Sequence, residues 1–434
     1  MTAFLSATAV AQESAPQGTA ANPEGSQAPV LSSTEDGRTT VLDSFKSRRD
    51  KIAEERRQSI EESTISWQAR TYDFDRVNSN DSRSAAWALG GSLGVETGFF
   101  RHLVSFGATA YTSQPLYAPS DESGSKLLTN DQSGYTVLGE AYAQFKLSDD
   151  LGLTAGRRAF DTPYLARHDT RMTPQTFEGV VLQGTNSGDD DDTGEWRYGA
   201  GYVDKEKEVN SGDFIDLARV AGAKVDRGVA LGGVNYRQKD WGLGAVEYYS
   251  PDIINIFYTE AHYSIHAGET RDVNLHAQYT NQHSVGQELL TGSAFSANQL
   301  GVKAELATGG TLWTAAYTET GRGSTMQSPW SGYPGYTSVQ YNDFFNAGEN
   351  AFMLRAACTL KYLPGISAYG LWVRGTGSDK PSTQNEYDAS LEWSPPQGML
   401  RGMMLRARFA YFTETAKGPV TELRLMLFYT PPAK

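Results

Sequence analysis

Apolar and polar side chains alternate along most of the chain after residue 63. The run from Met403 to Thr413 shows this well, because its odd positions up to Tyr411 are apolar while its even positions include Arg406 and Arg408. A period of two is typical of a β-strand with one apolar and one polar face. Further runs repeat the pattern, at 272–281, 298–306, 351–361 and 421–429. The pattern therefore predicts an all-β fold whose strands have an apolar surrounding on one face and water on the other.

The connections between the candidate strands alternate between short and long. Residues 99–101 and 147–150 are short turns, whereas 113–134 and 319–350 are long loops. Barrels of even strand number in the outer membrane have short periplasmic turns and long external loops. We therefore expect a transmembrane antiparallel β-barrel of about 18 strands over residues 63–434. The candidate strands are 64–75, 86–98, 102–112, 135–146, 151–158, 176–184, 195–203, 229–237, 241–249, 256–265, 272–281, 298–306, 311–318, 351–361, 366–374, 386–394, 402–413 and 421–429.

The first 62 residues differ in composition from the rest of the chain. Ala9-Val10-Ala11 has the small-residue form of a signal-peptidase site, so residues 1–11 are interpreted as a residual export signal, with a flexible terminus as the alternative. Residues 12–40 hold few large apolar groups and are predicted to be a disordered tail. Residues 41–62 mix Lys and Arg with Asp and Glu, which indicates a charged, solvated helical segment; a plug or tether is the alternative.

Composition and charge narrow the classes of protein further. No apolar run approaches the roughly 20 residues that a membrane-spanning helix needs. The net charge of −13 disfavours nucleic acid, and we expect no such partner. The single cysteine, Cys358, cannot form a disulfide within the chain. It shares a strand face with Phe352 and Leu354, so we expect it to face lipid.

The polar faces of the last strands and of the first strand carry many basic side chains. Two arginines two residues apart on one strand, such as Arg406 and Arg408, stand about 7 Å apart, and an anion can pass between them. We predict a basic track along the lumen; the alternative is that these arginines pair with Asp388, Glu392 and Glu422 and only fill the lumen. The predicted track consists of Arg70, Arg355, Lys361, Arg374, Arg406, Arg408 and Arg424.

The long loop 159–175 combines charges of both signs, which orient dipolar solutes such as amino acids when they face each other across a narrow passage. His168 beside Asp169 also resembles part of a hydrolase site, but no nucleophile-elbow motif accompanies them, so no catalytic site is expected. The six histidines are scattered without matched ligand pairs, so we expect no metal and no cofactor. The side chains predicted to form the constriction are Arg167, His168, Asp169 and Arg171, with Asp343 from a later loop.

Three segments carry a resemblance to a known family. The segment from Asp161 to Val180, DTPYLARHDTRMTPQTFEGV, is similar to the constriction-loop region of the OprD family of substrate-selective outer-membrane porins. The segment from Ser328 to Tyr336, SPWSGYPGY, resembles the long loop that leads into a late strand of that family. The third segment runs from Gly398 to Arg408. The resemblance spans residues 64–429 and agrees with the 18 strands counted above.

The resemblance implies a monomer or loose homotrimer in the outer membrane of a Gram-negative bacterium, in contact with outer-membrane lipid and lipopolysaccharide. It also implies that inward-folded loops narrow the pore and that a ladder of basic side chains guides substrate carboxylates. The expected function is passive, selective diffusion of small polar solutes such as amino acids, peptides or organic acids. The alternatives are a barrel enzyme, protease or lipase, which needs an acid, base or nucleophile set at the rim, and an adhesin, which needs longer, repeat-rich external loops.

Overall fold

The structure is a computed structural model that describes residues 63–100, 103–187, 194–266, 272–330, 332–377 and 382–432. The expectations for residues 1–62, namely the export signal, the disordered tail and the charged helical segment, lie outside the described residues. No helix within the described ranges is long and apolar enough to span a bilayer.

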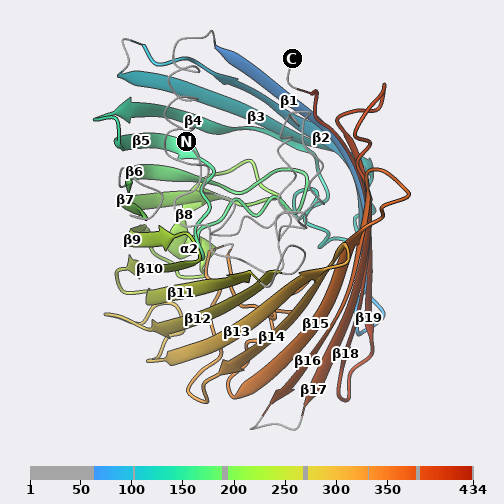
Figure 1. The fold of residues 1–434 in the computed structure, drawn as a ribbon. Coiled ribbons are helices and arrows are strands. Elements are labelled where there is room, and N and C mark those ends of the chain that lie inside the picture. The colour runs from blue at the N-terminus through green and yellow to red at the C-terminus, as the bar shows by residue number, and fades with distance from the viewer. Residues whose placement is uncertain are drawn as a thin grey trace.

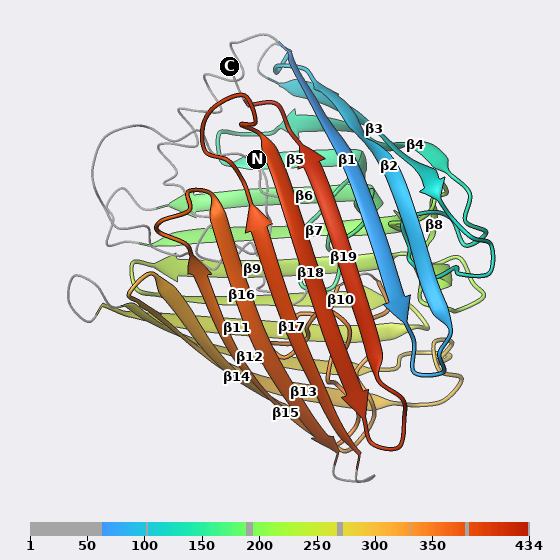
Figure 2. The same cartoon turned by 90° about the vertical axis from the view of Figure 1, so that its right-hand side faces the viewer.

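The described residues form one closed antiparallel β-barrel of 18 strands (Figure 1). Each strand pairs with its neighbours along the chain, and the first pairs with the last, with Arg70 opposite Phe428 (Figure 2). Closure gives every wall strand a partner on both sides, as a membrane requires. The two-residue β8 lies outside this ring, beside the end of β7. The elements are β1 (Thr64–Val77), β2 (Arg83–Glu96), β3 (Val104–Tyr117), β4 (Tyr135–Lys146), β5 (Leu151–Arg158), β6 (Thr176–Ser187), β7 (Glu195–Lys207), β8 (Ile215–Asp216), α2 (Leu217–Val220), β9 (Val229–Gln238), β10 (Trp241–Ser250), β11 (Ile254–His266), β12 (Asp272–His283), β13 (Ser296–Thr308), β14 (Thr311–Thr320), β15 (Glu349–Thr359), β16 (Ile366–Gly377), β17 (Thr383–Trp393), β18 (Met403–Glu414) and β19 (Val420–Tyr429).

The alternation in the sequence corresponds to the inside and the outside of this barrel. On β18, Arg406 and Arg408 are buried inside, whereas Leu405 and Phe409 are 49% and 44% exposed on the outside. Large apolar side chains that are exposed in a continuous band mark a surface that water does not cover. The predicted fold class and strand number are confirmed.

The long loops all lie at one end of the barrel, which also has short connections such as 251–253, while the tightest turns lie at the other end. Gly309 and Gly310 make the two-residue turn between β13 and β14, with φ of 60° and 80°, a conformation that glycine adopts without steric cost. The end with such turns is the periplasmic end by the rule for outer-membrane barrels, and the long loops mark the external end. Loops 118–134, 159–175 and 321–348 are at the external end.

Loop 159–175 leaves the external end and crosses the lumen. Asp169 forms an ion pair with Arg70 of β1. The ring of Tyr164 packs on that of Tyr248 in β10, with ring centres 5.7 Å apart. Since β10 lies near the opposite side of the ring of strands from β1, the loop spans the pore. Figure 1 shows this segment, in green, inside the barrel. The predicted inward folding is confirmed.

Cys358 gives a direct test of the strand register. It lies on β15 at the same parity as Phe352 and Leu354, which are 39% and 47% exposed on the outer wall. We expect a charged, membrane-impermeant maleimide to leave Cys358 unmodified in intact outer membranes and to modify it after denaturation. Rapid labelling of the folded protein would show that this strand has the opposite register.

Candidate functional site in the barrel lumen

Five of the seven side chains of the predicted track face the lumen, and Arg374 does not. On β16, Leu371 and Val373 are the inward-facing residues, so the neighbouring Arg374 points outward. The inner wall is apolar here because Phe344 of loop 321–348 packs in one cluster with both residues. The prediction that Arg374 points into the lumen was therefore wrong, because part of the inner face of β16 is apolar and covered by the loop.

The second correction concerns Lys361. The predicted strand 351–361 ends at Thr359 in the structure, and Lys361 is exposed in the turn 360–365 at the periplasmic end. A side chain beyond the end of the strand no longer follows its alternation. Lys361 therefore does not line the wall.

Basic side chains are gathered on one part of the inner wall. Arg408 of β18 is the direct register partner of Arg424 of β19, and both point inward. Like charges directly opposite each other destabilise a strand pair. The guanidinium carbons of Arg355 and Arg408 lie 4.6 and 5.5 Å from the ring centre of Tyr369, which extends the group to β15. We call the complete set the arginine row: Arg355, Arg408, Arg424, Arg171 and Arg76.

Phe74 of β1 is the centre of the other half of the arginine row. The guanidinium carbons of Arg76, Arg171 and Arg424 lie 5.1, 5.3 and 5.8 Å from its ring centre. The Nε atoms of Arg76 and Arg424 donate to the two carboxylate oxygens of Glu422, at 2.6 and 2.5 Å. Arg171 belongs to loop 159–175 and donates to two backbone carbonyls. Removal from water and the neighbouring Arg424 lower the pKa of Arg171, which reflects the crowding of positive charge.

Two predicted arginines lie outside the arginine row and are neutralised. Arg406 Nε donates to Glu392 at 2.7 Å, and Arg70 forms its ion pair with Asp169. Pairing with acids was the alternative to a basic track, and it describes Arg406 with Glu392 and also Arg424 with Glu422. The lumen therefore combines arginines that each have a carboxylate of their own with the arginine row, in which Arg76 and Arg424 share the single carboxylate of Glu422.

The predicted constriction residues separate into different roles. Asp169 and Arg171 reach the wall at β1 and β19, as described above. Arg167 instead forms an ion pair with Asp161 inside its own loop, with Nε to Oδ2 at 2.7 Å. His168 lies in a tight turn with φ of 46°. The charge-bearing part of the constriction loop is thus Asp169 and Arg171.

Asp343 does not face these residues. It accepts a hydrogen bond from the Ser338 hydroxyl at 2.5 Å, within loop 321–348. Removal from water raises the pKa of Asp343. The structure therefore brings Asp343 into the folded loop rather than opposite Arg167.

Carboxylates of the wall hold loop 321–348 in the lumen. Three consecutive backbone N–H groups, at 340–342, donate to Glu386 and Asp388 over distances of 2.6 to 3.2 Å. Asp388 was considered in the sequence as a partner of the arginines; it binds this backbone and also interacts electrostatically with Arg408 and Arg424. A loop held by buried charged hydrogen bonds is a fixed part of the pore wall.

The inner wall at β11, β12 and β13 carries both acidic and basic side chains. Glu305 lies 3.2 Å from His276 Nε2 and 3.5 Å from Lys303 Nζ. Lys303 Nζ also lies 5.2 Å from the ring centre of Tyr336 in loop 321–348. Within the described ranges, no group of three or more His, Cys, Asp and Glu side chains is arranged to hold a metal ion.

Neither Arg76 nor the central position of Phe74 was predicted from the sequence. The predicted first strand ended at residue 75, whereas β1 continues to Val77. Arg70, Phe74 and Arg76 lie on the same face of β1, so extending the predicted strand by one residue would have placed Arg76 in the lumen. No pattern in the sequence shows that Arg171, from a distant loop, completes the group around Phe74.

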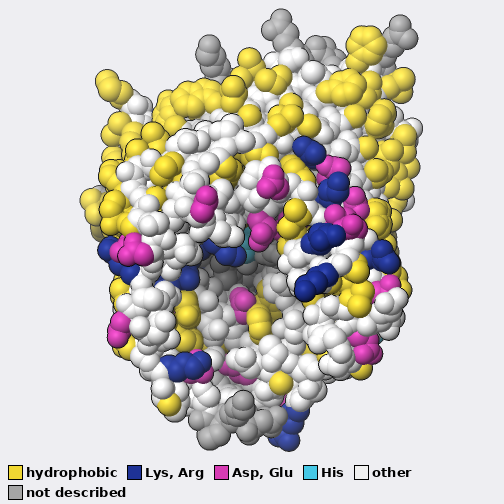
Figure 3. All heavy atoms as spheres, turned by 180° about the vertical axis from the view of Figure 1, so that it is seen from behind, with side chains coloured by type: hydrophobic (Ala, Val, Ile, Leu, Met, Phe, Trp, Pro, Cys, Tyr) yellow, Lys and Arg dark blue, Asp and Glu magenta, His cyan; other side chains and the backbone are white. Residues whose placement is uncertain are grey.

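A closed barrel with an apolar outer wall, a charged lumen and loops folded into it is a channel of the outer membrane. Figure 3 shows the hollow in one face, with Lys, Arg, Asp and Glu side chains around it. The chain belongs to the OprD family of outer membrane porins, because the model of that family matches residues 58–432. Members of this family are channels, not enzymes. It follows that the protein lies in the outer membrane and passes small solutes.

Solved structures with the same fold include porins of two organisms. OccK9 (OpdG) of Pseudomonas aeruginosa is 22% identical with a TM-score of 0.76, covering 86% of this chain and 98% of that one. OpdK of the same organism, solved with vanillate, is 20% identical with a TM-score of 0.76 and covers 85% and 98%. OccAB2 of Acinetobacter baumannii is 21% identical with a TM-score of 0.73 and covers 86% and 98%. Among curated proteins, none matches this chain.

Proposed function

We propose that this porin selects small solutes that carry a carboxylate and that the arginine row is the part of its wall that attracts them. The observation that carries the proposal is the direct opposition of Arg408 and Arg424, extended by Arg76 and Arg171 around Phe74. Like charges so arranged cost stability, and a passing anion relieves that cost. The arrangement favours a role in transport over a role in folding.

The balance of charge near the row supports the same conclusion. Five guanidinium groups belong to the arginine row, and the acids beside it are Glu386, Asp388 and Glu422. Glu386 and Asp388 already accept hydrogen bonds from the backbone of loop 321–348. Solutes respond to charges within a Debye length, about 8 Å at physiological salt, so the net charge of −13 over the whole chain does not decide selectivity.

Aromatic rings accompany the arginines. Tyr369 lies between Arg355 and Arg408, and Phe74 lies under the other three members of the row. Guanidinium groups that stack on rings are held in place and can present N–H groups to a planar carboxylate. OpdK has been solved with vanillate, an aromatic carboxylate, and this class of solute is a reasonable first probe here.

Glu422→Gln tests the proposal by a gain of selectivity. This change removes the carboxylate that Arg76 and Arg424 share and keeps a side chain of similar size, so the arginine row becomes more positive. We expect the ratio of benzoate to glucose uptake in liposomes to rise about threefold, corresponding to roughly 0.7 kcal/mol. The matched control is Glu319→Gln, because Glu319 is exposed on the outer wall of β14. An unchanged or lower ratio in Glu422→Gln would contradict the proposal.

A further inference from the structure

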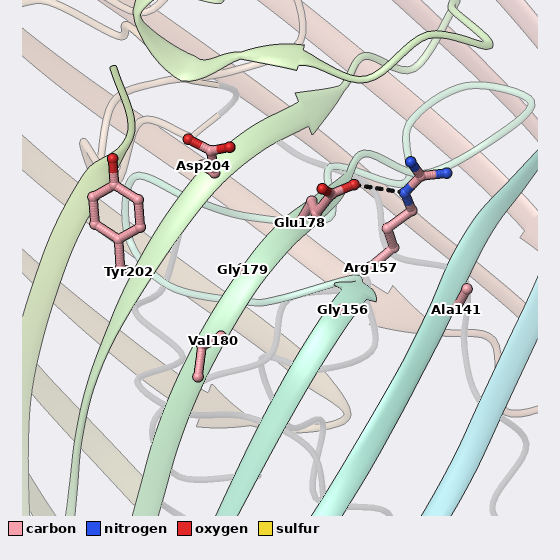
Figure 4. Close-up of a pocket in the computed structure, with 8 residues that line it drawn as sticks. All are labelled: Ala141, Gly156, Arg157, Glu178, Gly179, Val180, Tyr202 and Asp204. Atoms are coloured by element: carbon pink, nitrogen blue, oxygen red, sulfur yellow. Dashed lines mark hydrogen bonds and ion pairs between the residues drawn. The ribbon is translucent and has the colours of Figure 1, made fainter. Parts of the chain in front are cut away.

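The periplasmic rim of the barrel carries large apolar side chains that are exposed. At the external end of β5 and β6, by contrast, Arg157 and Glu178 on the outer wall form an ion pair, which suits water and lipid headgroups (Figure 4). At the periplasmic end, the connections 360–365 and 394–402 hold apolar side chains beyond the ends of the strands. We call this set the rim patch: Tyr362, Leu363, Met399 and Leu400, which are 90%, 53%, 98% and 43% exposed.

Hydrogen-bonded turns hold the rim patch outward. A hydrogen bond of 3.0 Å from Leu363 N–H to the Leu360 carbonyl closes a turn with Tyr362 at its tip. A second turn, 398–401, is closed by a hydrogen bond of 3.2 Å between its end residues and has the other two members of the rim patch at its centre. Such positions usually hold Gly, Pro, Asn, Asp or Ser, and exposed apolar patches mark surfaces that bind something else.

The first strand begins at the same rim, two strands away from the connection 394–402. β1 pairs with β19, and β19 pairs with β18, which follows that connection. Gln68 Nε2 donates to Thr430 Oγ1 at 2.8 Å, and Thr430 N–H donates to the Gly402 carbonyl at 2.9 Å. Figure 2 shows the connection from β17 to β18, in red, at the same end of the barrel as the start of β1, in blue. The chain before β1 therefore reaches the rim about 10 Å from the rim patch.

The segment that precedes β1 carries apolar side chains at helical spacing. In residues 41–62, which the sequence predicts to be helical, four large apolar side chains are separated by 3, 7 and 8 positions, so a helix would place them on one face. They are Leu42, Phe45, Ile52 and Ile60. Six basic and six acidic side chains make most of the remaining surface polar. Residues 12–40 hold few large apolar groups and offer little surface to cover the apolar face.

The length of this segment matches the distance to the rim patch. As a helix, its 22 residues would be about 33 Å long. The path from β1 to the connection 360–365 crosses four strands, or about 20 Å. The two connections also adjoin each other, because Ser394 N–H donates to the Gly365 carbonyl at 2.7 Å. One helix can therefore cover both turns.

We propose that residues 41–62 lie along the periplasmic rim as an amphipathic helix whose apolar face covers the rim patch. A segment that is covalently attached two strands away is present at a high local concentration, so a modest apolar contact is enough to hold it there. Its charged face then points to the periplasm. The contact lies on the rim of β15–β18 and not across the lumen, so it is independent of the arginine row.

Disulfide trapping in the whole chain tests this contact. Cys358→Ala removes the single natural cysteine, and Phe45→Cys is then combined with Met399→Cys. With copper phenanthroline as catalyst, the two thiols lose two protons and two electrons to oxygen, and we expect a disulfide in most of the folded protein, detected by gel mobility with and without reductant. The matched control combines Phe45→Cys with Phe100→Cys, because Phe100 is exposed at the same end but on the other side of β1. This pair should form about tenfold less disulfide.

Protection of the rim patch gives a second measurement. In detergent micelles, a maleimide should label Met399→Cys about fivefold faster when residues 41–57 are deleted, because the deletion uncovers the patch. The labelling rate of Phe100→Cys should be the same with and without the deletion. Each variant must show the heat-modifiable gel mobility of a folded barrel, and Tyr362→Cys replaces Met399→Cys if the latter lacks it.

Several results would overturn the proposal. Equal disulfide formation in both pairs, or a labelling rate that the deletion leaves unchanged, would show that the segment does not cover the rim patch. A disulfide between two copies of the chain would assign the patch to a second molecule. Protection in liposomes that persists after the deletion would assign it to lipid.

Discussion

Deletion of residues 164–171 will raise the single-channel conductance several-fold. These residues contain both points at which loop 159–175 meets opposite walls, Tyr164 against Tyr248 and Asp169 against Arg70. The deletion therefore removes the segment that spans the lumen. Conductance rises with the open cross-section of a pore, and a spanning loop is the part that limits it.

The chain can close without this segment. Arg158 and Phe177 are register partners at the ends of β5 and β6, so a shorter connection joins them without moving either strand. Planar-bilayer recordings of the deletion variant, after a check of heat-modifiable mobility, give the measurement. If a correctly folded deletion variant keeps the wild-type conductance, loop 321–348 alone sets the width of the pore.

The strands were predictable because two solvents act on the two faces of each one. Lipid outside and water inside impose a period of two, which is why β4, β5 and β18 begin and end within one residue of their predicted bounds. The prediction of which face points inward fails where the inner face is also apolar. On β16 the inner face holds Leu371 and Val373 because Phe344 covers it, so alternation did not reveal which face was inside.

The lumen was only partly predictable. The sequence placed Arg408 and Arg424 inside, and the structure agrees. It does not reveal that they are direct partners, because register depends on the exact lengths of turns that a pattern locates only approximately. It also did not separate Arg167, which pairs with Asp161 in its own loop, from Arg171, which reaches Phe74 across the lumen. Contacts between distant loops and the wall need the folded chain.

If the arginine row attracts carboxylates, the double variant Arg408→Gln with Arg424→Gln should lose this attraction. Gln keeps most of the size and polarity of each side chain, and lumen positions tolerate such changes. The two charges removed oppose each other across β18 and β19, so their loss also removes a repulsion and the barrel should fold. The matched control is Arg374→Gln, which removes a charge from the outer wall.

The measurement is the uptake of benzoate and of glucose into liposomes that contain each variant. We expect the double variant to lower benzoate uptake about fivefold, which corresponds to roughly 1 kcal/mol, and to leave glucose uptake unchanged. Arg374→Gln should alter the uptake of neither solute. Equal slowing of both solutes, or no change in either, would show that the arginines serve the fold and that the selectivity proposed here is wrong.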